Sequence, residues 1–101
     1  NTEKPKKAVS VKFVIKKVSD FYDIGEEVIY EKTRRREVVR PRQVIMYLLR
    51  EDFHVSYPTI GNKLGGRDHT TVMHSCDKIK EDLKKDSVLA EEIRQIRTLL
   101  K

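Results

Sequence analysis

Residues 58–79 read PTIGNKLGGRDHTTVMHSCDKI, and this segment determines the fold that we expect for the chain. Ser56 is a favourable N-cap for a short helix over 58–64, whose first-turn proline lacks only an N–H that has no helical partner there. The Gly-Gly pair at 65–66 ends that helix, because glycine adopts left-handed backbone at little steric cost. Asp68 then caps a second, longer helix. A short helix, a tight turn and a longer helix have the dimensions of a helix-turn-helix.

Hydrophobic spacing predicts helices in the rest of the chain as well. An amphipathic stripe predicts a helix over 9–22, followed by a short helix over 26–30. Pro41 is expected in the first turn of an apolar helix that ends near Phe53. Two further stripes with intervals of three and four residues are Val72, Cys76, Ile79 and Leu83 in one helix, and Leu89, Ile93, Ile96 and Leu100, after a Ser87 cap, in the last. No strand pattern competes, so the sequence predicts an all-α, compact helical bundle that contains a helix-turn-helix over residues 9–101.

Composition and charge restrict the class of protein. The chain has 101 residues, and 22 Lys and Arg against 16 Asp and Glu give a net charge of +6. This length suits one domain, and the basic balance suits an acidic partner. The one cysteine, Cys76, cannot form an internal disulfide, which favours a reducing, cytoplasmic compartment. No apolar run is long enough to span a membrane, and no phosphate-binding glycine motif is present.

The positive charge is concentrated before the third helix. Residues 31–42, EKTRRREVVRPR, contain six basic residues and two acidic ones without a helical stripe. We therefore expect a solvated basic loop here. By itself such a run is most often only a solvated surface, but its combination with a helix-turn-helix indicates a nucleic-acid partner.

The first turn of the second helix in the motif carries side chains that can read base edges. Asp68 can accept a hydrogen bond from a base amino group, and His69 can donate or accept one. Thr70 and Thr71 combine a hydroxyl with a methyl group, which suits a thymine or a phosphate oxygen. One turn further on, His74 and Lys78 share a face at i, i+4 spacing from which they could reach phosphates.

The motif GGRDHTTVMHSCDKI at 65–79, preceded by RPRQ at 40–43, resembles the C-terminal DNA-binding domain, or domain IV, of the DnaA family of bacterial chromosomal replication initiators. The resemblance covers residues 9–100. It implies binding of double-stranded DNA at short A·T-rich DnaA boxes of the replication origin. No cofactor is implied for this chain.

The resemblance also implies roles for individual residues. Those matching base-reading positions in the major groove are Asp68, His69 and Thr70, with Thr71 and His74 in support. The basic-loop arginine that enters the adjacent minor groove corresponds to Arg34, and Arg35 and Arg36 are neighbours that could share its role. A narrow A·T-rich minor groove attracts such an arginine. Further positions expected to face DNA or support its phosphates are Arg42, Pro58, Arg67 and Lys78.

Members of this family carry an ATP-binding module upstream, so residues 1–8 are expected to be the end of a linker from it. ATP and magnesium belong to that module only. The segment FHVSY at 53–57 departs from the family pattern, which puts phosphate contacts there in doubt. The resemblance implies a cytoplasmic, nucleoid-associated protein, and we expect this piece to be monomeric. The DNA-binding surface is also open to regulatory proteins.

Three other interpretations compete with DNA binding. The helices could form an interaction module that docks on an acidic protein, which a weak salt dependence of binding would reveal. Asp68, His69 and a threonine superficially resemble a hydrolase triad, but adjacent helical residues point in different directions, so no enzyme is expected. His69 and His74 could suggest a metal, yet no third ligand has suitable spacing. Asp68 could also serve only as an N-cap, and Cys76 is most simply a small buried hydrophobic residue.

Overall fold

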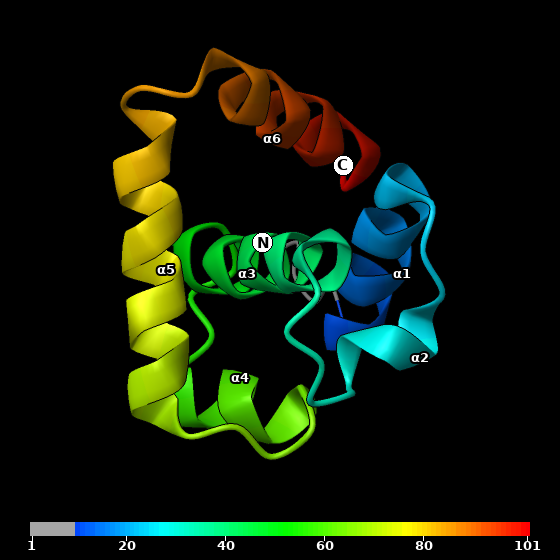
Figure 1. Ribbon diagram of the computed structural model, residues 1–101, viewed down its shortest axis with the longest axis vertical. Helices are drawn as coiled ribbons and strands as arrows, with labels where there is room; N and C mark the ends of the chain where they lie inside the picture. The colour runs from blue at the N-terminus through cyan, green and yellow to red at the C-terminus, as the bar shows by residue number, and fades with distance from the viewer. Residues whose placement is uncertain (1–9) are drawn as a thin grey trace, which may run out of the picture.

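The computed structural model describes residues 10–101, which form six α-helices and no strand (Figure 1). The helices are α1 (Val11–Tyr22), α2 (Glu26–Ile29), α3 (Arg36–Glu51), α4 (Tyr57–Lys63), α5 (His69–Leu83) and α6 (Ser87–Leu99). The predicted all-α bundle is therefore confirmed. The predicted linker tail at residues 1–8 lies outside the described residues.

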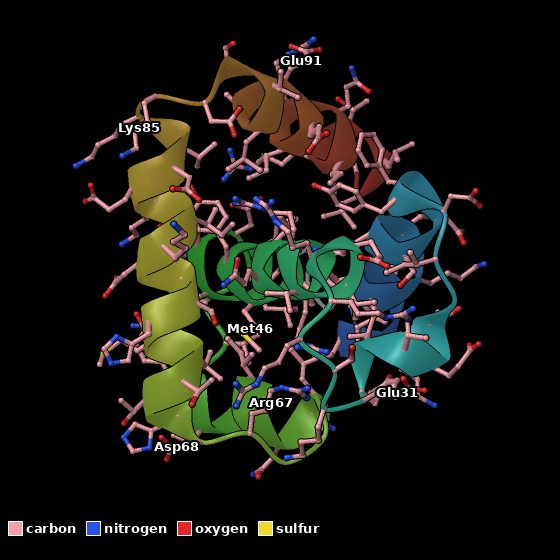
Figure 2. All side chains as sticks on the ribbon, viewed as in Figure 1. Glu31, Met46, Arg67, Asp68, Lys85 and Glu91 are labelled. Carbon is pink, nitrogen blue, oxygen red and sulfur yellow. The ribbon has the colours of Figure 1, made fainter. Side chains whose placement is uncertain are left out.

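Helix α3 lies at the centre of the bundle, with α1 on one side and α5 on the other (Figure 1). Helix α6 contacts both α1 and α5 and so covers one edge of α3, while α4 packs against α3 and α5 at the opposite edge. The side chains of Glu31, Arg67 and Asp68 are spread across the α4 end of the molecule, with Arg67 between the other two, and Lys85 and Glu91 lie at the α6 end (Figure 2). This arrangement brings the basic segment and the helix-turn-helix to one end.

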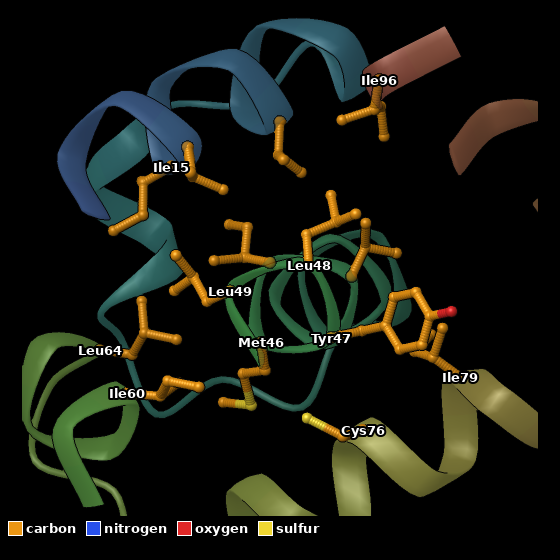
Figure 3. Packing of buried hydrophobic residues seen from close by; sticks show 14 of the residues in the cluster. Ile15, Met46, Tyr47, Leu48, Leu49, Ile60, Leu64, Cys76, Ile79 and Ile96 are labelled. Carbon is orange, nitrogen blue, oxygen red and sulfur yellow. The ribbon is translucent and has the colours of Figure 1, made fainter. Parts of the chain in front are cut away.

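A single aliphatic cluster fills the space between the helices (Figure 3). The run Val44–Leu49 is buried along its whole length, because α3 has neighbours on nearly every side. The stripes of α5 and α6 that the spacing predicted are confirmed, since Val72, Cys76, Ile79, Leu89, Ile93, Ile96 and Leu100 are all buried. Leu83 is only half-buried. The buried faces of α4 and α5 belong to this core, so the helix-turn-helix is packed directly on α3.

The prediction of a loop over 31–42 is wrong in its second half. Helix α3 begins at Arg36, so Pro41 lies in its second turn instead of its first. There the proline leaves the carbonyl of Glu37 without its usual N–H donor, a cost that burial of the same helix face offsets. Val38 and Pro41 are both buried and extend the stripe of the later turns. The preference of proline for the first turn of a helix is only a tendency, and here the burial of Val38 outweighs it.

The helix ends follow local chemistry. Ser56 caps α4 by accepting from the N–H of Thr59, and Asp68 caps α5 by accepting from the N–H of Thr70, as predicted. The cap predicted at Ser87 is wrong, because Asp86 precedes it and accepts from the N–H of Leu89. A carboxylate placed one residue earlier reaches the third helical N–H in the usual way.

No helix in the described part of the chain is long and apolar enough to cross a membrane.

Candidate nucleic-acid interface

The connection between α4 and α5 is a tight turn that only small residues permit. Gly65 and Gly66 both have left-handed backbone, with φ of +88° and +76°. The N–H of Arg67 donates to the carbonyl of Gly61 at 2.8 Å. A Cβ added at Gly61 would overlap the Arg67 carbonyl oxygen and lie 3.5 Å from Cγ2 of Val72. The glycine at 61 thus allows α4 to lie directly on the turn and on the first turn of α5.

The first turn of α5 points its polar side chains to solvent. Asp68 and His69 have side chains that are 65% and 60% exposed, and Thr71 is also exposed, whereas Thr70 is half-buried. The Asp68 carboxylate is held in place by the N–H of Thr70, 3.2 Å from Oδ2. Its capping contact occupies one oxygen, so the other remains able to accept a hydrogen bond from outside. Capping and base contact are compatible at this position.

His74 and Met73 continue the exposed face one turn further along α5. Met73, which is 36% exposed, is a surface residue that the expected site does not include. The signal was available, since residue 73 falls outside the buried stripe and follows His69 and Thr70 at i+4 and i+3 spacing. An exposed apolar side chain among polar ones can contact a thymine methyl group.

The basic loop, residues 30–35, connects α2 to α3 at the same end of the molecule (Figure 1). Arg34, Arg35 and Arg36 are exposed, and Arg36 is already the first residue of α3. Arg35 lies 3.8 Å from the Glu37 carboxylate, with both side chains well solvated. Arg34 makes no hydrogen bond or ion pair with another residue in 10–101 within the usual limits. This loop therefore presents positive charge beside the turn between α4 and α5, which its residues 30 and 31 contact.

Arg42, which the motif suggests as a DNA-facing or supporting residue, is buried against the basic loop. It is 8% exposed, and its guanidinium donates to the carbonyls of Ile29, Thr33 and Glu31, at 3.1, 3.3 and 2.8 Å. Burial, together with the positive charge of Arg67, lowers the pKa of Arg42. Its place on the α3 stripe was the missed signal, since positions 38, 42, 45 and 49 fall on one face of a helix. The structure gives Arg42 the task of holding the basic loop against α3.

Arg67 is also directed inward. Its guanidinium donates to the carbonyl of Leu64 within the turn and to the carbonyl of Glu31 in the basic loop, the latter at 2.6 Å. Burial lowers its pKa. Figure 2 shows Arg67 between Asp68 and Glu31, where it faces across the gap between the two segments. Two arginines therefore donate to the same loop carbonyl.

Lys78 is paired within the bundle. Its amine lies 3.5 Å from Oδ1 of Asp82, whose other oxygen is 3.0 Å from the Arg40 guanidinium of α3. Although burial by itself raises the pKa of Asp82, the hydrogen bond from Arg40 and the charge of Lys78 outweigh it and lower that pKa. Lys78 is still 59% exposed, so it can approach a phosphate, but Arg40 serves the packing of α3 on α5.

Pro58 is exposed in the first turn of α4, at the same end of the bundle. Among residues 10–101, no group of three His, Cys, Asp or Glu side chains is arranged to hold a metal ion.

The Asp68 and His69 side chains approach each other, with Oδ1 of Asp68 and Nδ1 of His69 3.7 Å apart. The prediction that the side chains of Asp68 and His69 point in different directions is wrong. Asp68 is an N-cap residue with extended backbone, not a helical residue, so its side chain can turn toward His69.

Together, the fold and the polar, basic end of the bundle define a helix-turn-helix domain of the kind that places its second helix against nucleic acid. Comparison with known proteins refines this class. The family described as "Bacterial dnaA protein helix-turn-helix" matches residues 11–79. The chain belongs to this DnaA family.

Curated relatives cover nearly the whole chain. It is 45% identical over 96 residues to the chromosomal replication initiator protein DnaA of Limosilactobacillus reuteri, covering 95% of this chain and 22% of the relative. It is 48% identical over 92 residues to the DnaA protein of Chloroflexus aurantiacus, covering 91% of the chain and 19% of the relative. The DnaA protein of Herpetosiphon aurantiacus is 46% identical over 95 residues, covering 94% of the chain and 20% of the relative. The chain thus spans about a fifth of the length of these relatives.

Proposed function

We propose that this domain binds double-stranded DNA sequence-specifically at A·T-rich DnaA boxes of a replication origin, as part of an initiator of bacterial chromosome replication. The first turn of α5 enters the major groove, and an arginine of the basic loop enters the adjacent minor groove. The observation that carries the proposal is the presence of two chemically different segments at one end of the bundle, one polar and one basic. Membership of the DnaA family supports the same assignment.

The two segments have complementary tasks. Phosphate attraction is sequence-independent, and the exposed guanidinium groups at 34–36 are suited to it. Sequence selection requires donors, acceptors and methyl groups at base edges, which Asp68, His69 and Thr70 provide at the end of a rigid helix. The positive N-terminus of α5 also favours a nearby phosphate. A basic loop can thus bring the domain to DNA, while a turn of helix with little charge selects the site.

The direct test is a fluorescence titration of the chain on two duplexes, with and without a DnaA-box-like site, at two salt concentrations. We expect tighter binding to the site and a log–log salt slope of about −0.9 for each neutralised phosphate. A flat salt dependence and equal binding to both duplexes would instead favour the module that docks on an acidic protein.

Single substitutions distinguish the reading of bases from the sequence-independent attraction to DNA phosphates. Changing Asp68 or His69 to Ala should cost about 1–3 kcal/mol on the specific duplex and little on random DNA. Lys84→Ala is the matched control, because Lys84 lies at the far end of α5 and, within residues 10–101, forms an ion pair with Glu81 alone. Equal losses on both duplexes would contradict base reading by α5.

Arg34→Ala should weaken binding mainly where A·T pairs lie beside the α5 footprint. Arg35→Ala and Arg36→Ala are measured beside it, because both side chains are exposed neighbours that could share the role of Arg34. If Arg34→Ala leaves the preference for A·T pairs unchanged, the minor-groove role moves to Arg35 or Arg36, whichever substitution removes that preference.

A further inference from the structure

We propose that Arg67 is a positioning residue that fixes the basic loop to the start of α5, so that the loop and α5 meet the DNA as one rigid unit. The inference rests on the proposed function and deepens it. In the DNA-facing motif, Arg67 precedes Asp68 directly, and a phosphate contact is the simpler expectation for an arginine there. Its hydrogen bonds point to a different task.

Arg67 connects two segments that are 36 residues apart in the sequence. The Nη1 atom of its guanidinium donates to the carbonyl of Leu64, the first residue after α4, and the Nη2 atom donates to the carbonyl of Glu31 in the basic loop. Its backbone is fixed too, since its N–H donates to the carbonyl of Gly61. Because a planar guanidinium holds its donors in a rigid fork, the two carbonyls are kept at a set separation.

The loop and the turn also contact each other directly. A Cβ at Gly65 would lie 2.8 Å from the carbonyl oxygen of Tyr30, too close for any residue but glycine. From the other side, the Nη2 atom of Arg42 donates to the same Glu31 carbonyl at 2.8 Å. Residues 30 and 31 are therefore held between the turn and α3. Arg34 follows only three residues later, so its starting point relative to Asp68 is fixed.

Preorganisation explains why this connection matters for binding. A loop that had to be ordered on the DNA would lose conformational entropy at each association, and its arginine would reach the minor groove less often. A loop that is already fixed at residue 31 loses less conformational entropy when the domain binds DNA. Arg67 thus acts through Arg34. Removing Arg67 should therefore lower the DNA affinity only when Arg34 makes its contact.

A double-mutant cycle tests this coupling. The affinities of wild type, Arg34→Ala, Arg67→Lys and the double variant are measured on a specific duplex and on one with G·C pairs beside the α5 footprint. We expect Arg67→Lys to weaken specific binding several-fold and to have less than about a twofold effect in the Arg34→Ala background. Lysine keeps the charge but lacks the fork, so a phosphate ligand would be rescued by it and a positioning residue would not.

Additive effects of the two substitutions, or full rescue by lysine, would overturn the proposal. Thermal melting and circular dichroism check that each variant is folded.

An independent measurement needs no DNA. Backbone NMR order parameters of residues 31–35 should fall in Arg67→Lys while those of α3 and α6 stay constant. Unchanged loop order parameters would refute the positioning role. If Arg34→Ala leaves discrimination intact, the proposed minor-groove contact is wrong, and the NMR comparison still decides whether Arg67 holds the loop.

Discussion

Substituting Gly61 by Ala tests whether close contact between α4 and the turn is what makes the helix-turn-helix possible. Helix propensity alone predicts a gain of about 1 kcal/mol, because alanine is the better helix former. The structure predicts the opposite sign. The new Cβ would overlap the Arg67 carbonyl oxygen and lie 3.0 Å from its carbonyl carbon, and neither atom can move without moving the turn.

The magnitude follows from these opposing terms. Overpacking a tight contact costs about 1–3 kcal/mol. Displacing the turn also weakens the hydrogen bond from the Arg67 N–H to the Gly61 carbonyl, which is worth about 1 kcal/mol. This second cost cancels the propensity gain, so we expect a net loss of about 1–3 kcal/mol, or about 4–8 °C in Tm for each kcal/mol in a domain of this size.

The assay is thermal and urea unfolding followed by circular dichroism, with two comparison variants. Gly66→Ala should lose only about 1 kcal/mol, because its φ of +76° is strained for alanine but no atom of the described residues lies within 4 Å of the new Cβ. Gly25→Ala should change stability by less than about 0.5 kcal/mol, because the nearest atoms in the described part of the chain belong to the carboxylate of Glu27, the far end of a flexible side chain that can turn away. A Gly61→Ala variant that melts at or above the wild-type temperature would refute the packing argument.

Three further predictions concern the rest of the bundle. Asp82→Asn should lower the free energy of unfolding by about 1–3 kcal/mol at neutral pH, since it weakens the charged contacts to Arg40 and Lys78. Because the folded pKa of Asp82 is lowered, that stability is complete above its unfolded value of about 4 and disappears as pH falls through the folded pKa, so urea titrations of wild type and variant should converge in acid. The Cys76 thiol, fully buried and with a pKa raised to about 11, should react with a disulfide reagent much more slowly in the folded protein than in urea, and equal rates would contradict its burial. Arg97→Lys should cost about 1 kcal/mol, because the paired contacts of Nε and Nη2 to Asp52, at 2.9 and 3.0 Å, need a guanidinium; an unchanged melting curve would show that the pair contributes nothing.

The sequence determined the parts of the fold that depend on local chemistry. The apolar intervals of α5 and α6, the caps at Ser56 and Asp68 and the Gly65-Gly66 turn each follow from interactions within about four residues, and each is confirmed. The resemblance to the DnaA family rested on the same contiguous motif, and the family match confirms it. The first turn of α5 is exposed because the buried stripe of that helix begins only at Val72.

Only the tertiary structure decided which basic residues face solvent. In residues 31–42 the sequence presents six similar charges, but α3 starts at Arg36 and its rotation turns Arg40 toward Asp82 and Arg42 toward the loop carbonyls. A charged side chain is buried only where partners from distant segments satisfy it, and no local pattern shows where those partners lie. The link from Arg67 to Glu31 has the same origin, since it joins segments brought together by the packing of α2, α3 and α4 around one core.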